Sequence, residues 1–442
     1  MMQMPPDVRA CMDALENAGF AAYLVGGCVR DAYLGLTPND FDITTSALPE
    51  QTEAVFSGHK LVLAGKKHGT IGVVTDSGVV EITTFRTEGD YTDSRHPQWV
   101  KFVPDIESDL ARRDFTVNAM AYSPTRGFAD PFGGRADLGA GLLRAVGDPA
   151  KRFEEDALRI LRGIRFAAKY NLALESATKD AMFALAPKME HLAQERIFEE
   201  LCRFLLWANR AQITEFAPLL ASVIPELAPT LGFDQRSPHH AYDVFTHIAH
   251  VTAAVPPELP LRWAALLHDI GKPATFTTDA TGRGHFYGHA KISAEMADAI
   301  LRRLKAPTAL REEAVLLIGQ HMTKLEPEKK LLRRRLSRLG KENLELLLAL
   351  QEADMGSKGM GKLKEMSQFL QLRTLLDEIY AENACLNLKD LAVSGHDLMA
   401  LGLTGKAIGQ TLQYLLEQVI DETLPNDKET LLQAAKNILL TD

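Results

Sequence analysis

The chain changes its pattern near residue 149, and this change restricts its possible folds more than any other feature. Before that point, short runs rich in β-branched and aromatic residues are separated by glycines and charged turns. After it, apolar residues recur at helical spacing almost to the C-terminus. The sequence therefore predicts an α+β fold, with an α/β head over residues 1–148 followed by an all-helical remainder.

Local signals place the expected elements and domains. A helix is expected over residues 6–17, because it starts with proline and ends near Gly19. A chain of 442 residues is too long for one core. Strands are expected over residues 21–25, 41–44, 60–63, 71–75 and 79–85. The expected domains are a head (1–148), a helical neck (149–235), a helical body (236–360) and a helical tail (361–442), with an exposed hinge near 356–364.

Composition excludes several classes of protein. The hydrophobic share of 46% and the charged share of 24% are typical of a soluble globular protein. No apolar run is long enough to span a bilayer, and the N-terminus lacks a secretion signal, so we expect a cytoplasmic protein without a membrane partner. The four cysteines form no CxxC pair. A net charge of −9 argues against a uniformly basic surface but leaves room for a local basic patch.

A glycine pair follows the first expected strand. Gly26 and Gly27 stand between residues 21–25 and a helix that opens at Cys28. A strand, a glycine turn and a helix N-terminus form a site where free backbone N–H groups can meet a phosphate, and Arg30 can add a charge-assisted contact. A plain tight turn is the alternative interpretation of the two glycines.

Two aspartates on the next expected strand are the catalytic candidates. Asp40 and Asp42 are two residues apart, so on a strand both side chains would lie on one face. Two close carboxylates repel unless a divalent cation lies between them, and Mg²⁺ bound there can serve phosphoryl transfer. An ordinary exposed turn is the alternative.

These motifs, together with residues 110–120 (LARRDFTVNAM), resemble the polymerase β nucleotidyltransferase superfamily. The closer resemblance is to its class II branch, which holds bacterial CCA-adding enzymes and poly(A) polymerases. It implies a polymerase-β-like head in which Arg113 contacts the incoming nucleotide. Asp114 and Glu81 are rival candidates for a third catalytic carboxylate, and the sequence does not choose between them.

A basic stripe follows the head. On a helix expected from Glu154 to Tyr170, four residues step by three along one face: Asp156, Arg159, Arg162 and Arg165. An aspartate accepts hydrogen bonds and an arginine donates them, so one such pair can accept cytosine and adenine and reject uracil and guanine. A solvated ladder of salt bridges is the alternative. The run EDxxR resembles the nucleotide-selecting motif of the class II enzymes, which implies that Asp156 and Arg159 read the base while Arg162 and Arg165 support the base or triphosphate.

Two further segments bear on the product. Residues 63–71 resemble the CCA-adding version of the head, and the polar segment 86–97 resembles the mobile loop with which full CCA-adding enzymes switch from C to A. The resemblance thus implies addition of C, C and A to the 3′ end of tRNA from CTP and ATP. A poly(A) polymerase is the first alternative.

The helical half carries a second set of metal ligands. His247, His268, Asp269 and Asp354 are suitable ligands for a divalent metal, and His289 and His321 can extend the set toward a second ion. Their order matches the pattern of HD phosphohydrolases, which implies an HD-type body. A metal-dependent phosphohydrolase acting on nucleotides or RNA ends is therefore the second alternative function. A structural His–Asp hydrogen bond is the alternative interpretation of the residues.

A basic cluster and the tail complete the chain. The cluster at residues 329–338 has two interpretations, a grip on tRNA phosphates or a solubilising helix face. The tail, from Ser394 onward, resembles the tail of CCA-adding enzymes and implies a tRNA-binding role.

Overall fold

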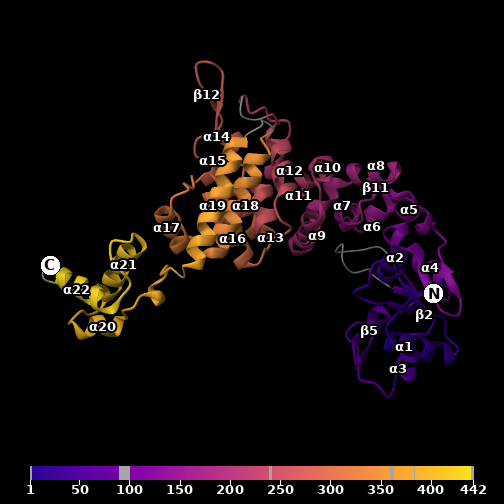
Figure 1. The fold of residues 1–442 in the computed structure, drawn as a ribbon. Helices are drawn as coiled ribbons and strands as arrows, with labels where there is room; N and C mark the ends of the chain where they lie inside the picture. The colour runs from indigo at the N-terminus through magenta and orange to yellow at the C-terminus, as the bar shows by residue number, and fades with distance from the viewer. Residues whose placement is uncertain (1, 89–99, 238–240, 359–362, 383, 440–442) are drawn as a thin grey trace. The chain divides into compact units, whose positions relative to one another are not determined.

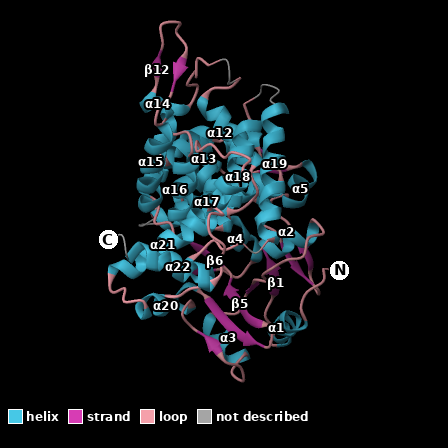
Figure 2. Cartoon of the chain, turned by 60° about the vertical axis from the view of Figure 1, so that its left-hand side comes forward, coloured by secondary structure: helices cyan, strands magenta, loops and turns pink. Residues whose placement is uncertain are grey.

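The computed structural model describes residues 2–88, 100–237, 241–358, 363–382 and 384–439. The chain divides into two compact units, residues 1–225 and 226–442. The main sheet belongs to the first unit, whereas helices α12 to α22 dominate the second (Figures 1 and 2). The predicted α+β architecture is confirmed, and the division into four domains stays a prediction.

A seven-stranded sheet forms the centre of the head, in the order β3-β4-β5-β2-β1-β8-β9. Only β2 and β5 are parallel neighbours within it. The strands are β1 (Ala22–Val25), β2 (Ile43–Thr45), β3 (Leu61–Val62), β4 (Thr70–Thr75), β5 (Gly78–Thr84), β8 (Ala121–Ser123) and β9 (Gly127–Ala129). All five predicted strands are present. The prediction that Asp40 and Asp42 lie on a strand is wrong, because β2 begins at Ile43.

Helix α1 (Pro6–Asn17) has the predicted bounds and contacts β1. Its buried residues Val8, Cys11, Met12 and Leu15 recur at the i, i+3, i+4, i+7 spacing of one helix face. Each large apolar side chain buried in this way contributes about 1.5–3 kcal/mol. The packing of this face fixes the helix against the sheet that the catalytic candidates Asp40 and Asp42 adjoin.

The other elements of the first unit are mostly short helices. Two small sheets pair β6 (Arg86–Glu88) with β7 (Val100–Phe102) and β10 (Leu142–Leu143) with β11 (Ala173–Leu174). The predicted loop at 86–97 falls largely on residues 89–99, which lie outside the described residues. The helices are α2 (Gly27–Tyr33), α3 (Pro49–Val55), α4 (Ile106–Ala111), α5 (Gly134–Ala140), α6 (Pro149–Glu155), α7 (Leu158–Tyr170), α8 (Ser176–Ala184), α9 (Gln194–Trp207), α10 (Arg210–Glu215) and α11 (Ala217–Val223).

Two sequence expectations about the region after residue 149 are wrong. The helix expected from Glu154 to Tyr170 is two helices, α6 and α7, separated at Asp156 and Ala157. The remainder is also not entirely helical, because β11 lies in it and a hairpin pairs β12 (Thr277–Thr278) with β13 (Gly284–His285).

The second unit is a set of packed helices. Its helices are α12 (Val244–Ala254), α13 (Leu259–Leu267), α14 (Lys272–Thr275), α15 (His289–Arg303), α16 (Thr308–Gln320), α17 (Lys329–Leu339), α18 (Lys341–Gly356), α19 (Leu363–Ala381), α20 (Gly395–Ala400), α21 (Lys406–Ile420) and α22 (Lys428–Leu439). Within the described residues, no helix is long and apolar enough to cross a membrane. The expected hinge at 356–364 includes residues 359–362, which lie outside the described residues.

Candidate active site

The parallel pairing of β2 with β5 brings three carboxylates together. Its register pairs Ile43 with Ile82, so Asp42 and Glu81, one residue earlier on each segment, are neighbours. Ile43 and Ile82 are buried in the core, whereas Asp42 and Glu81 are exposed on the opposite face. Asp40, Asp42 and Glu81 all line one cavity of about 660 Å³.

The electrostatics of this cavity suit a cation. The Asp42 side chain reaches solvent, but many protein atoms surround its carboxyl group and exclude part of its hydration shell. This loss of hydration raises the pKa of Asp42, and the negative charge of Glu81 raises it further, against the opposing effect of Arg113. A set of oxygen ligands with excess negative charge fits a hard divalent cation such as Mg²⁺.

Asp114, the rival third carboxylate, has a different environment. It is buried, and it accepts hydrogen bonds from the Phe115 backbone N–H (2.8 Å), Asn118 Nδ2 (3.0 Å) and Arg162 Nε (2.8 Å). Burial alone would raise the pKa of Asp114, but the Arg162 charge and these hydrogen bonds lower it to about 2. Both oxygens of Asp114 are thus engaged by the protein, whereas Glu81 faces the cavity.

The turn after β1 lies against an arginine. Gly26 has a φ of +74°, and a Cβ placed on it would meet Arg113 Nη1 at 2.8 Å. Arg113 Nη2 lies 3.7 Å from Asp109 Oδ2, and Asp109 is fully buried and also pairs with Arg112 at 3.0 Å. The buried Arg113 Nε has no hydrogen-bond partner among the described residues. Sequence reasoning missed Asp109, although its i, i+3 and i, i+4 spacing to the two arginines was a readable signal.

Arg30 joins the head to α7. Its side chain is buried, and it donates hydrogen bonds to Asp31 Oδ1 (2.9 Å), Asn118 Oδ1 and Tyr170 Oη (2.5 Å). Its guanidinium also lies over the Tyr170 ring at 4.3 Å. Sequence reasoning missed Asn118 and Tyr170, since such long-range partners leave no local pattern. Contacts of Arg30 and Gly27 with a phosphate stay predictions.

Asp156 occupies the break between α6 and α7. Its Oδ1 accepts a hydrogen bond from the Leu158 backbone N–H (2.9 Å), and its Oδ2 accepts one from Arg196 Nη2 (3.2 Å). Asp156 therefore caps the start of α7 and is held by α9. The Arg159 backbone N–H donates to the Asp156 carbonyl (3.0 Å), whereas the two side chains bond other partners, Arg196 for Asp156 and Glu155 for Arg159.

Each of the three arginines predicted on the stripe forms an ion pair with a carboxylate from another part of the first unit. These pairs draw on the end of α6, the segment after α4, and α9. They are Arg159 with Glu155 (2.7 Å), Arg162 with Asp114 (2.7 Å) and Arg165 with Glu200 (2.5 Å). The arginines are thus ion-paired, but largely within the protein rather than in the solvated ladder of the alternative interpretation, and base reading by the same residues stays a prediction.

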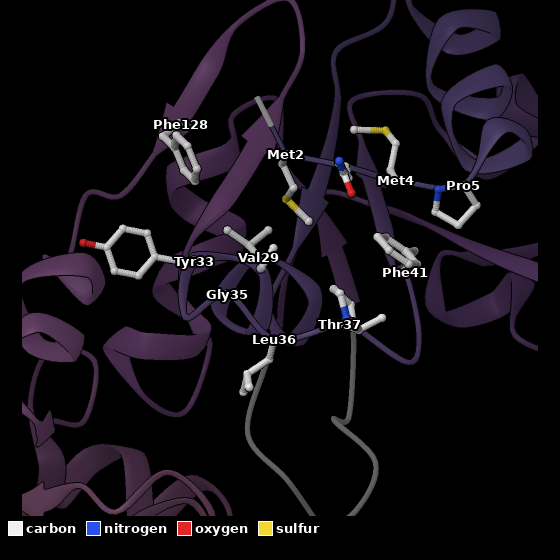
Figure 3. Close-up of a pocket in the computed structure, with 13 residues that line it drawn as sticks. Met2, Met4, Pro5, Val29, Tyr33, Gly35, Leu36, Thr37, Phe41 and Phe128 are labelled. Carbon is white, nitrogen blue, oxygen red and sulfur yellow. The ribbon is translucent and has the colours of Figure 1, made fainter.

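A larger cavity, lined mostly by residues with apolar side chains, adjoins the carboxylate cavity. Its volume is about 830 Å³, and it shares Pro5, Pro38 and Phe41 with its neighbour. Figure 3 shows side chains of Met2 and Met4 and the Phe128 ring around it. None of the three catalytic candidates lines this cavity, whereas all three line the cavity beside it.

The second unit gathers the other predicted ligands into two groups. The first group is His247, His268 and Asp354, and the second is Asp269, His289 and His321. Within each group, the possible ligand atoms lie within 4.8 Å of one another, and every member is buried.

The orientation of three histidines suits metal binding. Each uses Nδ1 to bond a backbone carbonyl three residues earlier, which leaves Nε2 directed at the cluster. The pairs are His268 with Ala265 (2.8 Å), His289 with Phe286 (2.7 Å) and His321 with Ile318 (2.7 Å).

Asp269 lies between the two groups. Its Oδ2 is 3.2 Å from His268 Nε2, and its Oδ1 is 3.3 Å from His289 Nε2. His268 Nε2 and Asp269 Oδ2 are buried and form no hydrogen bond of good geometry with the described residues. Burial, together with the charge of His268, lowers the pKa of His321 to about 4. These nitrogen and oxygen donors fit one or two divalent metals.

Comparisons with known proteins agree with this arrangement. A family model described as "Poly A polymerase head domain" matches residues 22–144, one described as a polymerase A RNA and SrmB binding site matches 171–209, and one for domain 2 of tRNA nucleotidyltransferases matches 275–435. The head sheet, its carboxylates and these matches define an RNA nucleotidyltransferase.

Relatives of nearly full length narrow the class. The CCA-adding enzyme of Bacillus velezensis is 31% identical over 94% of this chain and 93% of its own. The CCA-adding enzyme of Streptococcus pyogenes is 32% identical over 98% of this chain and 97% of its own. The crystal structure of the Bacillus stearothermophilus CCA-adding enzyme in complex with CTP is 27% identical, covers 99% of both chains and has a TM-score of 0.70. The chain belongs to the family of CCA-adding enzymes.

Proposed function

We propose that this chain adds C, C and A to the 3′ end of tRNA without a template, using CTP and ATP and releasing pyrophosphate. The observation that carries this proposal is the cavity lined by Asp40, Asp42 and Glu81. The RNA 3′ hydroxyl attacks the α-phosphorus of the nucleotide there. Asp40 and Asp42 would hold Mg²⁺, which when bound would supply positive charge near the attacking hydroxyl and the leaving pyrophosphate. Arg113, whose Nε has no partner among the described residues, holds the triphosphate.

Base choice falls to Asp156 and Arg159. Asp156 accepts a hydrogen bond from the amino group of C or A, and Arg159 donates one to the adjacent ring nitrogen. Their partners Arg196 and Glu155 hold both side chains in place before a nucleotide arrives. Substitution of either residue by alanine is expected to blur the choice of C and A over U and G. Unchanged selectivity in both variants would refute this role.

One assay tests the main proposal. The protein is incubated with Mg²⁺, one labelled nucleotide and tRNA that ends before CCA, after C or after CC. Stepwise addition of C, C and A followed by arrest is expected, and Asp40→Ala is expected to abolish it. Unlimited addition of A would favour a poly(A) polymerase instead, and no incorporation by the unmodified protein would contradict both.

The buried clusters of the second unit favour a second function, metal-dependent hydrolysis of phosphate esters. Water would add its oxygen to phosphorus, the ester P–O bond would break, and the leaving oxygen would take a proton. The test is release of nitrophenol from p-nitrophenyl phosphate with Mn²⁺, compared between the unmodified protein and His268→Ala. Equal rates in both would contradict hydrolysis at this site.

The cytoplasmic location stays a prediction.

A further inference from the structure

A closed ring of polar contacts joins α7 to the helix that follows the glycine turn. Two residues of α7 take part in it, Arg162 near the middle of the helix and Tyr170 at its end. Arg162 Nε donates to Asp114 Oδ2 (2.8 Å), and Asn118 Nδ2 donates to Asp114 Oδ1 (3.0 Å). Asn118 Oδ1 accepts a hydrogen bond from Arg30 Nη1, and Arg30 Nη2 donates to Tyr170 Oη (2.5 Å). The ring thus starts and ends on α7.

Arg30 is the corner of this ring on α2. Its side chain is buried, and each of its three nitrogens donates to an oxygen of the protein, which belongs to Asp31, Asn118 or Tyr170. Helix α2 begins at Gly27, and a Cβ placed on Gly27 would lie 3.6 Å from Arg30 Nη2. The guanidinium therefore lies next to the glycine turn and holds the start of α2.

Tyr170 bonds two residues of α2 at once. Its hydroxyl accepts from Arg30 and donates to Asp31 Oδ1 (2.8 Å), and Arg30 Cζ lies 4.3 Å from the centroid of the Tyr170 ring. Burial raises the pKa of Tyr170, and the hydrogen bond to Asp31 raises it further against the opposing charge of Arg30, so the hydroxyl keeps the proton that it donates. Because Asp31 also pairs directly with Arg30 (2.8 Å), the guanidinium charge stays balanced without the tyrosine. The tyrosine hydroxyl is therefore a link between two helices rather than a charge partner.

The ring connects the two parts of the proposed nucleotide site. The triphosphate part includes Arg113, which directly precedes Asp114 of the ring, and the base-reading part, Asp156 and Arg159, lies at the start of α7. A ligand that uses both parts must span them, so it binds best when their separation is fixed before it arrives. A ligand that uses only the triphosphate part does not benefit from this fixed separation.

We propose that Tyr170 is a positioning residue for nucleotide selection, which through Arg30 holds α2 and the glycine turn at a fixed distance from the base-reading end of α7. This rests on the base reading proposed for Asp156 and Arg159. CTP and ATP, whose bases match that pair, benefit from the link because base and triphosphate engage together. UTP, whose base does not match, binds through its triphosphate and benefits little. The link therefore contributes to the choice of C and A rather than to nucleotide binding in general.

The test compares the full-length protein with Tyr170→Phe, which removes the hydroxyl and keeps the ring beside Arg30. The matched control is Tyr33→Phe, which removes the hydroxyl of a tyrosine that is 41% exposed at the end of α2. Incorporation of a single nucleotide into tRNA lacking CCA gives kcat and KM for CTP and for UTP. Inhibition of CTP incorporation by inorganic triphosphate reports on the triphosphate part alone. Because both nucleotides are measured on one preparation, a smaller folded fraction cancels in the CTP to UTP ratio of kcat/KM.

Tyr170→Phe is expected to raise the KM for CTP about fivefold, the loss typical of one hydrogen bond, with little change in kcat. The KM for UTP and the inhibition by triphosphate should not change, so the preference for CTP over UTP in kcat/KM should fall by the same factor. The control should match the unmodified protein.

Equal losses for CTP, UTP and triphosphate would show that Tyr170 only stabilises the fold, and would overturn the proposal. An unchanged preference for CTP in Tyr170→Phe would overturn it as well. No preference for CTP over UTP in the unmodified protein would contradict the proposed base reading, and the positioning role with it.

Discussion

Replacing Asp114 by asparagine tests whether this residue is structural. The Asp114 carboxylate is buried and held by Arg162, Asn118 and a backbone N–H. Its pKa is lowered from 3.8 to about 2. A depression of that size corresponds to about 2–2.5 kcal/mol of stability at neutral pH. We therefore expect Asp114→Asn to lower the free energy of unfolding of the first unit by about 2 kcal/mol at pH 7.

The dependence on pH gives this prediction its signature. A carboxyl whose pKa is depressed in the folded state stabilises the fold above its unfolded pKa, and this stability is lost as the pH falls through the folded value. The difference between variant and unmodified protein should thus be constant from pH 7 to about 5, fall to about half near pH 3 and vanish below about pH 2. Urea unfolding of the variant and the unmodified protein, followed by circular dichroism at each pH, measures this difference.

The matched control is Glu107→Gln, which makes the same change of carboxyl to amide at an exposed position of α4. It should alter stability by less than about 0.5 kcal/mol. A loss at Asp114 no larger than in this control, or one independent of pH, would refute the reasoning. In that case Asp114 would be free to serve as the third catalytic carboxylate.

Three further predictions address the two sites. Gly26→Ala places a Cβ 2.8 Å from Arg113 Nη1 and should lower kcat/KM for nucleotide addition by roughly tenfold or more, whereas Gly35→Ala, with a similar φ of +72° and open space around it, should cost only about 1 kcal/mol of stability. Glu155→Gln removes the ion pair that holds Arg159, the proposed base-reading arginine. Incorporation of UTP relative to CTP, measured with tRNA lacking CCA, should therefore rise by about tenfold. Mn²⁺ should raise the melting temperature of the unmodified protein by a few degrees, and Asp354→Asn should remove this shift without changing CCA addition.

Local sequence patterns predicted the helices and strands that are determined by neighbouring residues in the chain. The bounds of α1 follow from its proline start and its glycine stop, and the five predicted strands of the main sheet are present. The two predicted aspartates line one cavity, although they precede the strand. The Asp42 carbonyl still accepts a hydrogen bond from the Val25 N–H (3.1 Å), so regular pairing with β1 ends beside Asp42, where Gly26 turns the chain.

Contacts between residues far apart in the sequence could not be predicted from local sequence patterns. Glu81 lies beside Asp42 only because β2 and β5 run parallel in one particular register. The sequence supplies both residues but no signal of that register. The break at Asp156 is a different case, since an aspartate that caps the N–H two residues later competes with a continuous helix. That signal was readable, but the regular spacing of the following arginines favoured one long helix.

The ion pairs on α7 also change how its two interpretations relate. Ion pairing and base reading are compatible roles for the same side chains, because a buried arginine needs a carboxylate partner in either case. Arg159 is held by Glu155 and by the backbone carbonyls of Arg152 and Arg112, so few of its conformations remain accessible. A side chain fixed before the nucleotide arrives loses less entropy on binding. Under the proposed base-reading role, Arg159 also could not turn to suit a base with the inverted hydrogen-bond pattern, and the ion pairs of the first unit would then add to selectivity.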